Sequence, residues 1–188
     1  MPSPKSDAKR SGHMPESRDR RRVGRLIARP PRPRLQKRIM KNEIIRIGQV
    51  EINFLLEGAD TKGAVALFEF TVPAGARVPA PHSHAHYDET IYGVEGVRTF
   101  IVEGKTVPVG RGESCVIRRG DIHGFKNLQS VAAKGLAVVT PALIGPEFFR
   151  EMAAIVNVGG PPDLATMKET MLRHGLVPAP METLTANS

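Results

Sequence analysis

The chain has 188 residues, of which 40% are apolar and 24% charged, and its formal net charge is +8. That length is enough for one domain with a hydrophobic core and terminal extensions. No apolar run is long enough to span a bilayer, the N-terminus lacks the apolar segment of a secretory signal, and the single cysteine, Cys115, excludes an intrachain disulfide. We therefore expect a cytoplasmic protein that makes no membrane contact.

The positive charge is confined to the first forty residues. Residues 1–40 contain thirteen Lys/Arg and three Asp/Glu, a net of +10, whereas the remaining residues carry a net of −2. Arginine, proline and serine dominate this segment and aromatic residues are absent, which predicts disorder. Four interpretations of this segment are open. It is an untranslated stretch upstream of a start at Met40, a flexible tail without a targeting role, a basic arm for nucleic acid or anionic surfaces, or a targeting peptide, although its prolines argue against the helix that targeting requires.

From Lys41 onward the pattern changes to short strands. Apolar and polar residues alternate with a period of two, and glycines punctuate the series, which predicts an antiparallel sandwich or barrel over residues 41–144. The segment 58–63 is expected to be a turn. We expect the core to contain Phe68, Phe70, Phe100, Ile117 and Phe125. The predicted strands are 43–47, 49–56, 64–72, 89–94, 98–103, 105–109, 114–118, 123–127 and 134–140.

The C-terminal residues 145–188 change to helical spacing. Pro146–Val156 begins with a proline that suits a first helical position, and its apolar residues should pack on the strands. Residues 163–174 form a second predicted helix, with Asp163 as the N-cap and Gly175 after the last turn. The tail from Met181 is expected to fray.

Three histidines two residues apart form the densest cluster of metal-binding residue types. Residues two apart on a strand point to the same face, so His82, His84 and His86 can project together. A kink in the chain would bring Glu89 to meet them. Imidazoles and a carboxylate around one point suit a divalent transition metal.

A second stretch, residues 112–127, has the sequence GESCVIRRGDIHGFKN, and the two stretches together resemble the cupin superfamily. The first cupin motif has a glycine, H-x-H, three or four residues, Glu, six residues and Gly; the second is G-x5-P-x-G-x2-H-x3-N. Six residues rather than five separate Gly75 from His82, and Arg118 stands where the family has proline. The matched positions are His82, His84, Glu89, Gly96, Gly112, Gly120, His123 and Asn127.

The resemblance implies a single small jelly-roll barrel whose metal is held by His82, His84, Glu89 and His123. Fe(II) or Mn(II) is favoured, with Ni, Cu or Zn open. Four protein ligands on an octahedral ion leave two positions for substrate, water or dioxygen. His86 lies outside the motif, and we expect it near the mouth of the site or in solvent.

The remaining residues near the motifs have simpler interpretations. Tyr87 and Asp88 are expected at a turn. Cys115 alternates with Ile117 on a strand, which favours core packing over a reactive thiol.

Three functions remain open on this evidence. The first is a metal-dependent enzyme similar to the quercetin-dioxygenase-like cupins, acting on a small organic substrate with Glu89 as a general base. The second is a non-catalytic module that senses or stores a small ligand. The third is a sugar isomerase or epimerase on the same fold, although those often dispense with the metal. The resemblance also suggests a homodimer.

Overall fold

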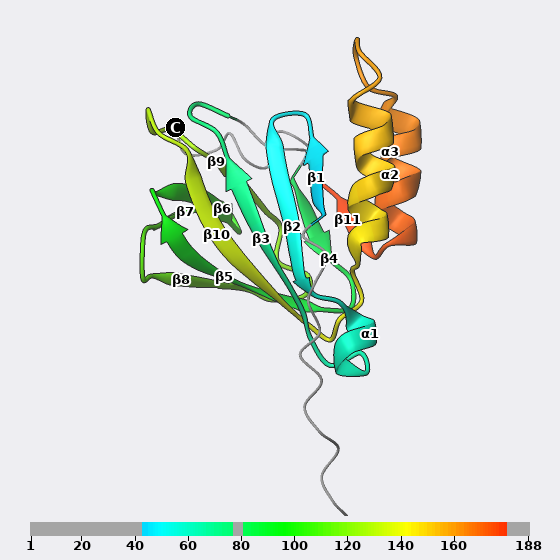
Figure 1. The fold of residues 1–188 in the computed structure, drawn as a ribbon, viewed down its shortest axis with the longest axis horizontal. Helices are drawn as coiled ribbons and strands as arrows, with labels where there is room; N and C mark the ends of the chain where they lie inside the picture. The colour runs from blue at the N-terminus through cyan, green and yellow to red at the C-terminus, as the bar shows by residue number, and fades with distance from the viewer. Residues whose placement is uncertain (1–42, 77–80, 180–188) are drawn as a thin grey trace, which may run out of the picture. The chain divides into compact units, whose positions relative to one another are not determined.

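The computed structural model describes residues 43–76 and 81–179, which form two antiparallel β-sheets with two longer helices on one side (Figure 1). All the described residues belong to one compact unit. The predicted disorder of residues 1–40 and the predicted fraying from Met181 lie outside the described residues.

The larger sheet has six strands in the order β1-β2-β3-β10-β5-β8. Every neighbouring pair in it is antiparallel. Strand β10 lies between β3 and β5, so a strand from late in the sequence pairs with two strands from earlier in the sequence. Its strands are β1 (Ile44–Ile47), β2 (Val50–Leu56), β3 (Ala66–Val72), β5 (Asp88–Glu95), β8 (Ser114–Ile117) and β10 (Ala133–Thr140).

The smaller sheet has five strands in the order β11-β4-β9-β6-β7, again antiparallel throughout. It contains two of the histidine-bearing segments side by side, because β4 pairs with β9 through His82 and His123. Its strands are β4 (His82–His84), β6 (Arg98–Val102), β7 (Lys105–Val109), β9 (His123–Lys126) and β11 (Leu176–Pro178).

The alternation of side chains along the strands builds the core. On β3, Ala66, Phe68, Phe70 and Val72 are buried, while the residues between them are only partly covered. Phe100 and Ile117 are buried in the same core, and Phe125 packs against it. The predicted antiparallel, mostly β architecture with two C-terminal helices is therefore confirmed.

Two short elements differ from the sequence prediction. The expected turn at 58–63 contains a one-turn helix, α1 (Gly58–Thr61), closed by a reciprocal capping box between Glu57 and Asp60. Strand β11 was not expected, because three residues are too few to show a period. It pairs with the histidine strand, placing Leu176 opposite His84.

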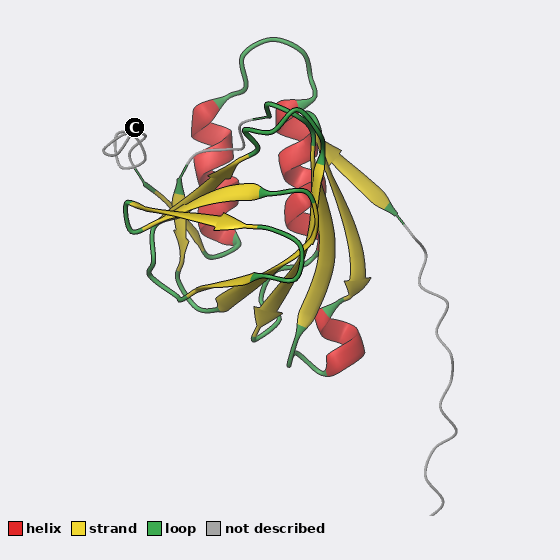
Figure 2. Ribbon diagram, turned by 90° about the vertical axis from the view of Figure 1, so that its left-hand side faces the viewer, coloured by secondary structure: helices red, strands yellow, loops and turns green. Residues whose placement is uncertain are grey.

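Helices α2 (Pro146–Val156) and α3 (Leu164–Arg173) lie side by side next to the strands, as the red helices in Figure 2 also show. The Asp163 side chain accepts hydrogen bonds from the amides of Ala165 and Thr166, as a predicted N-cap should. Gly175 ends α3 with a φ of +76°. Among residues 43–76 and 81–179, no helix has the length and apolar character needed to traverse a lipid bilayer.

Candidate metal centre

The pairing of β4 with β9 gathers three histidines at one point. One ring nitrogen from each of His82, His84 and His123 lies within 4.8 Å of the others. The ring centroids of His82 and His84 are 4.4 and 4.6 Å from that of His123. His82 and His123, which are 41 positions apart in the sequence, thus belong to one group because their strands are neighbours. Three imidazole nitrogens so placed could hold a metal ion.

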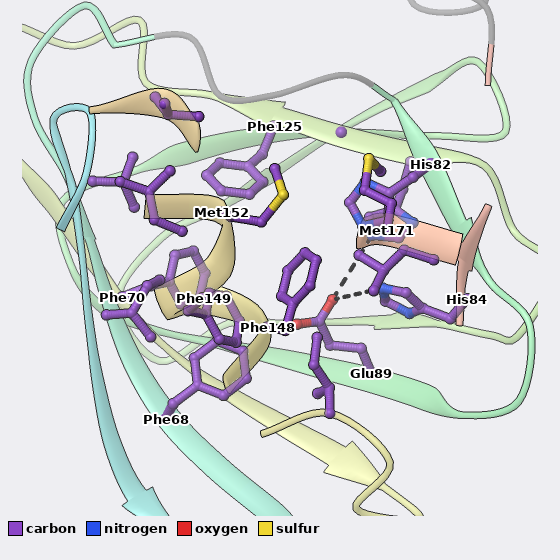
Figure 3. Close-up of a pocket in the computed structure, with 18 of the residues that line it drawn as sticks. Phe68, Phe70, His82, His84, Glu89, Phe125, Phe148, Phe149, Met152 and Met171 are labelled. Carbon is purple, nitrogen blue, oxygen red and sulfur yellow. Dashed lines mark ion pairs between the residues drawn. The ribbon is translucent and has the colours of Figure 1, made fainter. Parts of the chain in front are cut away.

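Glu89 reaches the same point from the other sheet. It lies on β5, and its Oε2 is 3.8 Å from Nε2 of His123 and 4.0 Å from Nε2 of His84 (Figure 3). Both separations are too long for hydrogen bonds. They fall within the roughly 4.2 Å that two ligands can span when each lies about 2.1 Å from one ion. The residues present therefore fit a divalent metal between them.

The tautomer of His123 is set by a backbone carbonyl. Its Nδ1 lies 3.1 Å from the carbonyl oxygen of Asp121, which can only accept a hydrogen bond. Nδ1 of a neutral imidazole must then carry the proton, which leaves the Nε2 lone pair facing Glu89 and the other histidines. Burial lowers the pKa of His123, which favours this neutral form.

His84 is held by packing. It is 3% exposed, and its ring stacks on Tyr87 with the centroids 4.3 Å apart and an interplanar angle of 24°. Burial, reinforced by the neighbouring His123 and His82, lowers the pKa of His84 to about 2. A neutral imidazole is the form that binds a metal. Nδ1 of His84 has no hydrogen-bond partner within the described residues.

Glu89 supplies the charge that the cluster lacks. Its side chain is mostly buried, and burial raises its pKa to about 7. A carboxylate there is costly to ionise without a cation nearby. A divalent ion would relieve that cost, because it binds the deprotonated carboxylate and the neutral imidazoles together.

The turn between β8 and β9 fixes the ligand strands. The Arg118 amide donates to the Asp121 carboxylate, a hydrogen bond that the proline of the family motif could not make. Gly120, at a φ of +89°, donates its amide to the His84 carbonyl. Arg119 pairs with both carboxylate oxygens of Asp88, next to Glu89. The departure from the motif is thus compensated locally.

The other motif residues separate into structural and exposed ones. The amide of Asn127, which is fully buried, donates to the carbonyls of Val72, Pro73 and Val131 and so ties the end of β9 to the end of β3. His86 is exposed and lies outside the histidine group, in agreement with its expected place in solvent. Cys115 is half-buried against the core, and burial raises its pKa.

A cavity of about 570 Å³ adjoins the histidines. His82, His84, His123 and Glu89 line one part of it, and apolar side chains from both sheets and both helices line the rest (Figure 3). The aromatic core residues at positions 68, 70, 100 and 125 are among them. The sequence did not single out Met167 and Met171, although their spacing of four places both on one face of α3.

Several solved structures are similar to about half of this chain. KdgF from Halomonas sp. is 18% identical with a TM-score of 0.44, over 49% of this chain and 78% of that one. A sugar phosphate isomerase of the cupin superfamily from Silicibacter pomeroyi is 21% identical with a TM-score of 0.44, over 50% and 60%. A predicted oxalate decarboxylase from Thermotoga maritima is 29% identical with a TM-score of 0.46, over 49% and 80%.

The family comparison concerns the strands that carry the site. Residues 68–139 match the Cupin_2 family, described as a cupin domain, and this span includes all four candidate ligands. None of the curated proteins compared with the chain matches it. The match covers less than half of the chain and agrees with the resemblance that the two sequence motifs carry.

Proposed function

We propose that the protein is a metal-dependent enzyme that acts on a small organic molecule, in the manner of the quercetin-dioxygenase-like cupins. His82, His84, Glu89 and His123 hold the metal, with Fe(II) or Mn(II) favoured over Ni, Cu or Zn. The observation that carries the proposal is the convergence of three imidazole nitrogens and one carboxylate beside a cavity large enough for a substrate.

The ligands and their surroundings divide the chemistry between them. The ion would polarise a substrate oxygen or activate dioxygen at the positions that the protein leaves free. Glu89 is the one carboxylate of the group; burial raises its pKa to about 7 without the ion, and when it leaves the ion it can act as a general base. The apolar walls exclude water from the substrate and so strengthen every polar interaction at the histidines.

Metal binding is the first test. Mn(II) or Fe(II) added to the purified full chain is expected to raise its melting temperature, because the ion binds only the folded state. His84→Ala should abolish this rise. His86→Ala is the matched control, because it removes an exposed histidine from the same stretch and should leave the rise intact. If no divalent metal raises the melting temperature of the unaltered chain, the proposal fails.

Turnover is the second test, and it separates the enzyme from a binding module. The metal-loaded protein is offered catechols, flavonols and β-diketones under air, and dioxygen consumption is recorded with an oxygen electrode. Uptake that His84→Ala loses supports an enzyme. A compound that binds without dioxygen uptake or product favours the alternative of a non-catalytic ligand-binding or sensing module.

A sugar isomerase or epimerase fits the cavity less well. Sugar hydroxyls need many hydrogen-bonding side chains, whereas the walls away from the histidines are almost entirely apolar.

Three wider expectations stay predictions: closure of the strands into one jelly-roll barrel over 41–144, a homodimer, and a disordered extension over residues 1–40. Sedimentation velocity of the full chain would test the homodimer.

A further inference from the structure

The cavity has one polar end and a long apolar remainder. Its polar end consists of the four candidate ligands and Tyr87. Phe68, Phe70 and Phe149 gather on the side away from the histidines (Figure 3). A volume of about 570 Å³ falls within the roughly 300–1,000 Å³ of small-molecule sites, so the space exceeds what dioxygen or a two-carbon acid would fill.

The apolar part offers nothing to balance a second charge. Among the lining residues that the structure describes there is no lysine, arginine, serine, threonine or asparagine, and the one amide side chain, Gln49, is exposed. A charged or multiply hydroxylated group pushed into this part would lose its water without gaining partners. The lining therefore selects against a substrate that is polar at both ends.

Helices α2 and α3 cover the apolar part with adaptable side chains. Met152 from α2 and Met167 and Met171 from α3 all line the cavity, and Figure 3 shows Met152 between the phenylalanines and the histidines. Methionine has an unbranched, flexible side chain that adjusts to the shape of its contact. A wall with three methionines can therefore adjust to apolar ligands of different shapes, and does not require one rigid ring.

The opening of the cavity lies between two connections. The exposed lining residues are Gly48 and Gln49 in the β1–β2 turn and Leu164 at the start of α3. Asn157, after α2, holds the two connections together: its Oδ1 accepts from the Gly48 amide at 2.9 Å, and its Nδ2 donates to the Arg46 carbonyl at 2.8 Å. An apolar residue that is 74% exposed, Leu164, therefore stands at this opening.

From these observations we infer the substrate class. The ligand is a predominantly apolar molecule with a single oxygen-bearing head group: the head group binds at the histidine cluster, and the apolar body lies under α2 and α3. The inference rests on the proposed metal centre for the position of the head group. The apolar body binds through the cavity wall, whether or not a metal is present.

The test is a titration calorimetry series with named probes. Straight-chain monocarboxylates from butanoate to decanoate are titrated into the full chain with and without Mn(II), together with decanedioate, which adds a second carboxylate at the far end. The affinity should rise about fourfold per added methylene until the cavity is filled. Decanedioate should bind at least about 100-fold more weakly than decanoate. Equal affinity across the series, or for the two ten-carbon acids, would overturn the inference.

A charge introduced into the wall sharpens the test. Met167→Lys places a cation beside the apolar part, because Met167 is buried and lines the cavity, and should shift the ratio of affinities toward decanedioate by about tenfold. Leu172→Lys is the matched control on the same helix, because Leu172 is half-exposed and does not line the cavity, and it should leave the ratio unchanged. If Met167→Lys does not melt cooperatively, Leu164→Lys at the opening replaces it, with the same expected direction. An unchanged ratio in a folded variant counts against the inference.

The series also separates this inference from the proposed function. If Mn(II) neither binds nor strengthens decanoate binding, while the methylene increment persists, then the metal centre is wrong and the apolar site stands. If Mn(II) binds but the affinities do not depend on chain length, then the substrate class is wrong and the metal centre stands.

Discussion

The histidine cluster and Arg98 are both buried between the two sheets, at the two ends of one strand. Val102 of β6 lies opposite His123, and Arg98 lies four residues earlier on β6, about 13 Å away at the usual rise of a strand. His84 and His123 are 3% and 2% exposed, and Arg98 is 0% exposed. Both places therefore hold polar side chains that have lost their water.

They differ in what surrounds the polar atoms. The histidine nitrogens converge on a cavity. The Arg98 guanidinium instead lies in the core, with Cζ 4.4 Å from the centre of the Phe70 ring, and none of its nitrogens has a hydrogen-bond partner among the described residues. Burial lowers the pKa of Arg98 to about 10. A lone buried charge is thus no evidence of a site, whereas converging lone pairs beside an open volume are.

The largest expected effect is on Mn(II) affinity, which a substitution in the histidine cluster should lower and a substitution of Arg98 should not. His123→Ala removes one of the candidate ligands and should weaken Mn(II) binding more than 100-fold, because even loss of an outer partner of a ligand costs about 10–100-fold. Arg98→Met is the matched core variant and should leave the affinity unchanged, since Arg98 does not line the cavity. Isothermal titration with Mn(II) checks both. Comparable losses in the two variants would mean that the cluster is not the binding site.

A second prediction concerns how the core accommodates Arg98. A Cβ built on Gly135 of β10 would lie 2.0 Å from Nη2 of Arg98, so this glycine makes room for the guanidinium. Gly135→Ala should lower the free energy of unfolding by about 1–3 kcal/mol through overpacking, measured by urea unfolding. The double variant Gly135→Ala with Arg98→Met should recover most of the loss, because it also removes the obstructing group. No recovery would show that the cost of alanine lies elsewhere.

The third effect is the pH dependence of metal binding. Glu89 must lose its proton to bind a cation, and its pKa is about 7, so the affinity for Mn(II) should rise about tenfold per pH unit from pH 5 to pH 7. His84 adds nothing in this window, because with a pKa of about 2 it is already neutral. The Glu89→Gln variant should bind Mn(II) more weakly, and its Mn(II) affinity should rise less steeply with pH. A variant with the slope of the unaltered chain would remove Glu89 from the ligand set.

The same group sets a stability trend in the metal-free protein. Because burial raises the pKa of Glu89 above its ordinary value of 4.5, its favourable contribution is full below about pH 4.5 and is lost as the pH rises through 7. The free energy of unfolding should therefore depend less on pH across this window in Glu89→Gln than in the unaltered chain. Urea unfolding at pH 5 and pH 7.5 measures the difference.

Much of the fold follows from local periodicity. The alternation on β3 and the exact bounds of α2 could be predicted because each period repeats several times within the element. The four candidate ligands could be named because the two motifs fix their spacing. Strand β11 could not be predicted, because it has only three residues. Its strand conformation depends on pairing with β4, which is distant in the sequence.

Contacts across the sheets were equally hidden from the sequence. Nothing in the order of residues indicates that Arg98 fills the space above Gly135, or that the Asp121 carbonyl sets the tautomer of His123. Tyr87 was expected at a turn. It precedes β5 directly, yet it is 1% exposed and stacks on His84. Register and burial, which no single stretch encodes, determine these roles.

The smallest expected effect tests that stacking role of Tyr87. Its hydroxyl is buried and has no hydrogen-bond partner among the described residues, so the ring alone carries the contact with His84. Tyr87→Phe keeps the ring and removes an unsatisfied polar group, and should raise the free energy of unfolding by at most about 1 kcal/mol. Mn(II) affinity should change less than twofold, whereas Tyr87→Ala, which removes the ring, should weaken both. If Tyr87→Phe instead loses stability, the hydroxyl has a partner that the stacking account omits.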